Sequence, residues 1–81
     1  MKEQIVNQMK AAIRIAIEEE HVYGWRALMF IALHKVVACS RDAVIRDLSV
    51  TTAMNFAHIA QEELLSGEGG EYYYDAFYKQ H

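Results

Sequence analysis

The sequence has one cysteine, no proline and no long run of apolar residues. Because Cys39 is alone, a disulfide within the chain is excluded, and either a reducing compartment or indifference to redox state is expected. The absence of proline and the apolar fraction of 53% argue for a compact fold and against disorder. Residues 27–33 form the most apolar run, far short of the roughly 20 residues that span a bilayer. With no secretory signal visible over residues 1–14, we expect a cytoplasmic protein that does not enter the membrane.

Basic charge is also scarce, since the net charge is −3. No stripe of Lys and Arg is present to follow a phosphate backbone, so we expect no direct contact with nucleic acid. Residues 49–61 contain no Asp, Glu, Lys or Arg, whereas residues 62–81 contain five acids and one Lys. This acidic end is the basis for one alternative function, a nucleic-acid mimic that blocks a DNA- or RNA-binding protein.

Motifs for catalysis and nucleotide binding are missing. The sequence contains no Gly-x-Gly-x-x-Gly, no phosphate-binding loop and no Gly-x-Ser-x-Gly turn. A nucleophilic pair of Cys39 with a histidine is conceivable, but we expect Cys39 to be a buried, inert thiol at the end of an apolar helix. We therefore predict a protein that is not an enzyme and needs no cofactor.

A helical metal-binding protein is a second alternative function. Glu18 and His21 have the Glu-x-x-His spacing, and His58 and Glu62 lie one helical turn apart, so the candidate ligands are His21, His58 and Glu62. A di-metal bundle uses about four inward carboxylates. The glutamates here fall mainly on polar faces, so we expect no metal site. His34 is expected to be a satisfied core or interface histidine.

Helical periodicity predicts an all-α fold, a small bundle of three main helices with a short linking helix and an aromatic C-terminal helix. Residues 1–81 form one domain with a helical body over 1–66, a glycine-rich connector over 67–70 and an acidic aromatic tail over 71–81. A chain of this length has a small core, which oligomerisation often supplements.

The first and third main helices each have one apolar face. The first spans residues 3–20. Its apolar face consists of Ile5, Val6, Met9, Ala12, Ile13, Ala16 and Ile17. The third is capped by Ser49 or Thr51, runs to Ser66 and ends at Gly67, which suits a left-handed conformation. The face of the third helix consists of Val50, Ala53, Ala57, Ala60 and Leu64, and its three alanines predict a close helix contact.

The second main helix, residues 25–39, follows a break at Gly24. Its polar residues are spread around the helix, so no face is continuously polar. Either it is the central helix of the domain or part of it meets another chain, and we expect a second copy of this chain. The predicted oligomer interface consists of Trp25, Met29, Phe30 and Ile59. A linking helix over 41–48 is predicted to have Ser40 as its N-cap and an Asp42–Arg46 pair.

The tail contains five of the nine aromatic residues. We predict a short helix, because Glu71, Asp75 and Lys79 align at a spacing of four. The predicted partner-binding residues are Tyr72, Tyr73, Tyr74, Phe77 and Tyr78. Aromatic side chains are favoured at interfaces, but the tail could equally pack on its own chain as a wall of the bundle.

These features predict a small, non-enzymatic protein–protein interaction module. We expect a homo-oligomer, most simply a dimer, that binds and modulates a larger protein of unknown identity. In size and style the chain is similar to the accessory and inhibitory factors of phages and mobile elements.

Overall fold

The computed structural model describes residues 1–79. The elements are α1 (Lys2–Glu18), α2 (Trp25–Ala32), the π-helix η1 (Leu33–Ala38), α3 (Ala43–Arg46), α4 (Val50–Ser66) and α5 (Gly70–Tyr78). Within residues 1–79 there is no strand, which confirms the all-α prediction. None of the described helices combines the length and the apolar character that a membrane crossing requires.

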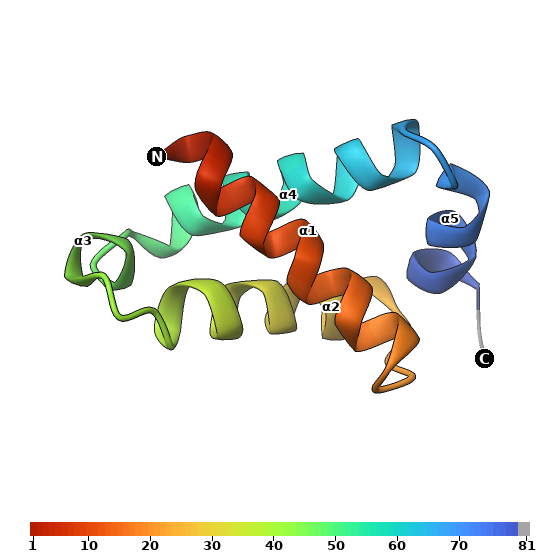
Figure 1. The fold of residues 1–81 in the computed structure, drawn as a ribbon, viewed down its shortest axis with the longest axis horizontal. Coiled ribbons are helices and arrows are strands. Elements are labelled where there is room, and N and C mark those ends of the chain that lie inside the picture. Colours follow the sequence, from red (N-terminus) through yellow and green to blue (C-terminus); the bar gives the residue numbers. More distant parts are fainter. Residues whose placement is uncertain (80–81) are drawn as a thin grey trace.

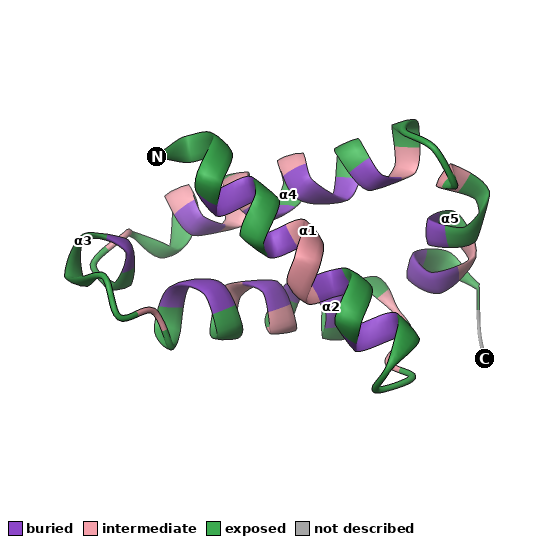
Figure 2. Ribbon diagram, in the orientation of Figure 1, coloured by how far each residue is buried: buried purple, intermediate pink, exposed green. Residues whose placement is uncertain are grey.

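The three long helical segments form two layers. The α2–η1 segment and α4 lie side by side, and α1 runs diagonally across both (Figure 1). The short helix α3 closes one end of the molecule, and α5 closes the other. Buried positions follow the sides of α1, α2 and α4 that face one another (Figure 2). The core therefore lies between α1 and the pair beneath it.

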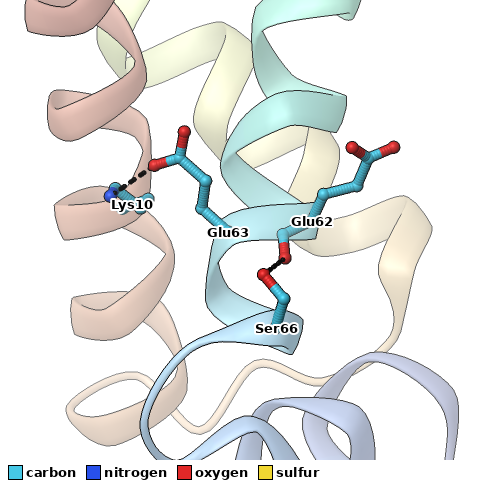
Figure 3. Close-up of polar contacts among 4 residues, drawn as sticks. All are labelled: Lys10, Glu62, Glu63 and Ser66. Atoms are coloured by element: carbon cyan, nitrogen blue, oxygen red, sulfur yellow. Dashed lines mark hydrogen bonds and ion pairs between the residues drawn. The ribbon is translucent and has the colours of Figure 1, made fainter.

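Helix α1 forms where the apolar periodicity predicts it. Ile5, Met9 and Ile13 are fully buried, whereas Ile15, which falls on the polar flank, is about half exposed. The Lys10 ammonium is 2.6 Å from a carboxylate oxygen of Glu63, and this ion pair joins α1 to α4 (Figure 3). An ion pair of this kind at the surface contributes at most about 1 kcal/mol to stability. Burial of the apolar row therefore contributes most to the packing of α1 on the other helices.

The predicted break at Gly24 is present. Gly24 has φ 101°, a conformation that residues with a side chain rarely adopt, and it precedes the first residue of α2. Its N–H donates to the carbonyl of Ala76 at 2.8 Å. The turn between α1 and α2 is thus fixed to α5 as well as to its neighbours.

The linking helix differs from the prediction in its cap and its side-chain pair. Asp42, not Ser40, is the N-cap of α3, and its carboxylate accepts from the N–H of Val44. The Ser40 hydroxyl accepts from the N–H of Asp42, just before the helix begins. Among the described residues no ion pair joins Asp42 to Arg46, because the Arg46 guanidinium donates to the carbonyl of Ser40.

Helix α4 begins at the predicted cap, where the Ser49 hydroxyl accepts from the N–H of Thr52. Ala53, Ala57, Ala60 and Leu64 are buried as expected. Val50 is not: it is 76% exposed, because the first residue of α4 lies at the open edge of the α2–α4 pair. Near the other end, the Ser66 hydroxyl donates to the carbonyl of Glu62 (Figure 3).

The glycine-rich connector forms a defined turn. Gly67 is extended (φ −92°, ψ −165°), so the predicted left-handed end is wrong, and Gly69 takes the left-handed conformation instead. A methyl group on Gly70 would collide with the carbonyl oxygen of Leu65. This close approach lets α5 fold back against α4 and α2.

We predict that Ala57→Leu lowers the free energy of unfolding by about 1–3 kcal/mol, because overpacking a close contact forces neighbours apart. Ala57 is fully buried on α4, the helix that packs against both α1 and α2. Urea unfolding followed by circular dichroism measures the loss. Ala27→Leu is the matched control, since Ala27 is exposed on α2. Equal stability of the two variants would show that the alanine face is not closely packed.

Candidate functional site

One apolar surface surrounds Phe30, and no residue of α1 lines it. Phe30 is 65% exposed beside a hollow of about 330 Å³. The residues lining this hollow, which we call the Phe30 surface, are Phe30, Leu33, His34, Val37, Ala38, Arg46, Leu48, Val50 and Ala53. Among these described residues Arg46 is the sole Arg, Lys, Asp or Glu. The surface thus offers an apolar recess with one cationic group at its rim.

Phe30 is held by its neighbour one turn later. Its ring stacks on the imidazole of His34, with centroids 5.6 Å apart and planes 4° from parallel. His34 is exposed, so the core position expected for it is wrong, and only the alternative, a position at an interface, agrees with its exposure. The stacked pair presents a flat, preformed aromatic face to solvent.

The π-helix η1 creates a contact that an α-helix would not allow. The N–H of Cys39 donates to the carbonyl of His34, five residues earlier, at 2.9 Å. In an α-helix two such residues lie about 140° apart around the axis, but in the wider π-turn their side chains meet, and Cys39 Sγ is 3.5 Å from His34 Nε2. Cys39 is exposed, so the expectation that its thiol is buried is also wrong. Regular helix periodicity over residues 25–39 gave no sign of this pair.

A thiol beside an imidazole is also the arrangement of cysteine nucleophiles. Such chemistry uses N–H donors that are free to stabilise an oxyanion. Here the N–H of Cys39 donates to His34 and the N–H of Ser40 donates to the carbonyl of Val37. These two donors nearest the sulfur are already committed within the turn, so the geometry does not favour acyl transfer.

The four residues predicted for the oligomer interface lie in different places. Phe30 is on the surface just described, and Trp25 is 41% exposed at the start of α2, with its ring centroid 6.4 Å from that of His58. Met29 is buried in the core of its own chain. Ile59 is half-buried in a groove between α1 and α4. Of the four, Phe30 and Trp25 are the ones most available to another chain.

The candidate metal ligands are not brought together. Glu62 and His58 are exposed on α4, and His21 lies in the turn after α1. Over residues 1–79 no group of three or more His, Cys, Asp or Glu side chains is placed to hold a metal ion. The structure therefore offers no site built from His21, His58 and Glu62.

Helix α5 divides its aromatic side chains between the core and solvent. Tyr73 and Phe77 are buried, and the amide of Gln61 donates to the hydroxyl of Tyr78, which ties α5 to α4. The tail is therefore a wall of the fold. Tyr72, Tyr74 and Tyr78 remain about half exposed, and the ring centroids of Tyr74 and Tyr78, one helical turn apart, are separated by 5.1 Å.

Negative charge accompanies these exposed tyrosines. The pKa of the Tyr72 phenol is raised, first by partial desolvation and to a smaller extent by the nearby carboxylate of Glu18. The predicted Asp75–Lys79 pair is present at 3.2 Å. The outer face of α5 is thus aromatic with acidic groups close by, and it is separate from the Phe30 surface.

Comparison of the chain with protein-family models, with curated proteins and with solved structures found no match in any of the three. The functional argument therefore depends on the surfaces themselves.

We predict that Phe77→Ala destabilises the fold by about 3–5 kcal/mol, the usual loss for a buried aromatic residue. Tyr74→Ala is the control. Tyr74 is about half exposed on the same helix, so its substitution should lower the free energy of unfolding far less. Thermal unfolding followed by circular dichroism distinguishes them. An unchanged midpoint for Phe77→Ala would mean that α5 is not part of the cooperative fold.

Proposed function

We propose that this protein is a small, non-enzymatic interaction module that acts as a homodimer and binds a larger protein as an accessory or inhibitory factor. The observation that supports it is the exposed Phe30 beside an apolar hollow on a preformed surface. Exposed apolar patches on small proteins commonly mark sites of association.

The proposed occupant of the Phe30 surface is a second copy of the chain. In a twofold dimer the same patch meets itself, so Phe30 of each copy would pack at the hollow of the other. The α4 part of this patch belongs to residues 49–61, which have no charged side chain, so two copies can approach without repulsion there. Burial of Phe30 and Val50, both mostly exposed in the single chain, supplies the apolar contact.

The larger partner is proposed to contact the outer face of α5. Tyr72 and Tyr74 combine large apolar area with a polar tip, which suits an interface. The acidic groups around them, Glu71 and Glu18 among them, suit a basic surface and predict binding that weakens with salt. The buried half of α5 keeps this face rigid.

We predict that Phe30→Glu converts the dimer to a monomer, because a carboxylate cannot be buried in the apolar contact. An aromatic side chain at the centre of an interface contributes about 2 kcal/mol or more to binding. The dissociation constant of the dimer should therefore rise at least about 30-fold. Light scattering over a concentration series measures it. Val44→Glu is the control, since Val44 is exposed on α3 and does not line the hollow. A wild-type monomer, or a Phe30→Glu dimer, would contradict the proposal.

We predict that Tyr72→Ala with Tyr74→Ala reduces capture of the larger partner from the native host at least about tenfold, with an unchanged thermal midpoint. Both side chains are exposed, so their loss removes contact area without opening the core. Quantitative mass spectrometry of captured protein at two salt concentrations makes the comparison. Val44→Ala is the control. Equal capture by the double variant would place the partner site elsewhere.

A further inference from the structure

The hollow of the Phe30 surface follows successive turns of the α2–η1 segment. Its lining on this segment begins at Phe30 and ends at Ala38. The eight steps from residue 30 to residue 38 correspond to about 12 Å at the rise of an α-helix. The start of α4 contributes Val50 and Ala53. The hollow is therefore an apolar groove along the helix, and its volume of about 330 Å³ falls in the range of small-ligand sites.

One cationic side chain, that of Arg46, lies at the Ala38 end of this groove. Its Nη1 group donates to the carbonyl of Ser40 at 2.6 Å. Ser40 comes two residues after the end of η1, so the guanidinium lies toward Ala38 and away from Phe30. The hydrogen bond holds the planar guanidinium in place and leaves its other N–H groups able to donate to a ligand.

No carboxylate neutralises Arg46 within the part of the chain that the structure describes. The cation of each ion pair found there is a lysine, and the carboxylate of Asp42 accepts from the N–H of Val44. A second copy docked through the same surface would not neutralise Arg46 either, because the residues lining the hollow include no Asp or Glu. The groove therefore complements an apolar chain with an anion at one end.

The lining of the groove favours a simple alkyl acid over a peptide. A peptide carries backbone N–H and C=O groups, and these need hydrogen-bond partners when they are buried. Among the lining residues, His34 is the only polar side chain besides Arg46, and its ring is stacked on Phe30. An alkyl chain needs no partner along its length, and a carboxylate accepts strong, charge-assisted hydrogen bonds from a guanidinium. An aliphatic carboxylate therefore uses both features of the groove.

The length of the groove indicates the length of the acid. With bonds of about 1.5 Å and angles of about 111°, an extended carbon chain rises about 1.25 Å per carbon. A chain of about ten carbons thus spans the roughly 12 Å between the two ends. The carboxylate then lies at Arg46 and the last carbons lie beside Phe30.

We propose that the hollow of the Phe30 surface binds a medium-chain aliphatic carboxylate, with its head group on Arg46 and its alkyl chain directed toward Phe30. Binding depends on the groove and its cation within one chain. The same hollow takes Phe30 of a second copy in the proposed dimer, so the acid and the second copy exclude each other. This competition, unlike the binding itself, rests on the proposed function, and it makes the dimer sensitive to the supply of such acids.

The test is titration of the full chain with decanoate below its micelle-forming concentration, followed by calorimetry and by backbone amide chemical shifts. One decanoate should bind per chain, with the largest shifts at residues that line the hollow. From hexanoate to decanoate, affinity should rise by up to about fourfold for each methylene buried, and dodecanoate should gain little more. An undiminished rise beyond decanoate, or shifts centred on another surface, would overturn the placement. Dileucine should bind more weakly, and equal affinity would overturn the choice of an alkyl chain.

The charge is tested separately from the chain. Decanol, which has the same chain without the charge, should bind about tenfold more weakly than decanoate. Arg46→Gln should remove this preference, and circular dichroism confirms that the variant is folded without its bond to Ser40. Arg41→Gln is the matched control, since Arg41 is exposed nearby and does not line the hollow. A preference for decanoate that persists in Arg46→Gln would show that Arg46 does not bind the head group.

Light scattering with and without decanoate separates this site from the proposed dimer. A dimer that dissociates at saturating decanoate supports both the site and the competition. Decanoate bound to a chain that is monomeric from the start supports the site and contradicts the proposed dimer. A dimer that keeps its mass with decanoate bound would overturn the competition. A dimer that binds no decanoate would overturn the site and leave the proposed function standing.

Discussion

The packing of α1 across two helices at once is the contact on which the other features depend. Its row of Ile5, Met9 and Ile13 is fully buried against α4 and the α2–η1 segment, and the alanines of α4 let these helices approach closely. Within residues 1–79 no further long helix lies on the opposite side. Phe30 and its hollow are therefore left exposed.

The sequence predicted the elements whose signals are local and periodic. The apolar row of α1, the cap at Ser49 and the break at Gly24 each depend on residues a few positions apart, and each is present. Gly67 and Val50 were predicted wrongly because their conformation and burial depend on tertiary packing. Gly67 is extended because α5 folds back, and Val50 is exposed because nothing covers the start of α4.

The candidate site was less predictable than the fold. Helical spacing indicated that the helix beginning at Trp25 has no continuously polar face, and this placed Phe30 in the predicted oligomer interface. The same spacing, however, treated residues 25–39 as one regular helix. The change to π-geometry at Leu33 has no marker such as proline or glycine in the sequence. It alters which side chains meet, and so brings together His34 and Cys39, which regular spacing keeps apart. π-Helical turns are frequently found at functional sites, where they reposition side chains.

The two proposed contacts lie on different parts of the molecule, and this separation has a functional consequence. The Phe30 surface includes residues of α3 and the start of α4, whereas α5 closes the opposite end (Figure 1). A dimer joined through the Phe30 surface would therefore leave the exposed tyrosines of both α5 helices free. Two linked partner sites raise the overall affinity for a partner that is itself repeated, because the second contact becomes intramolecular.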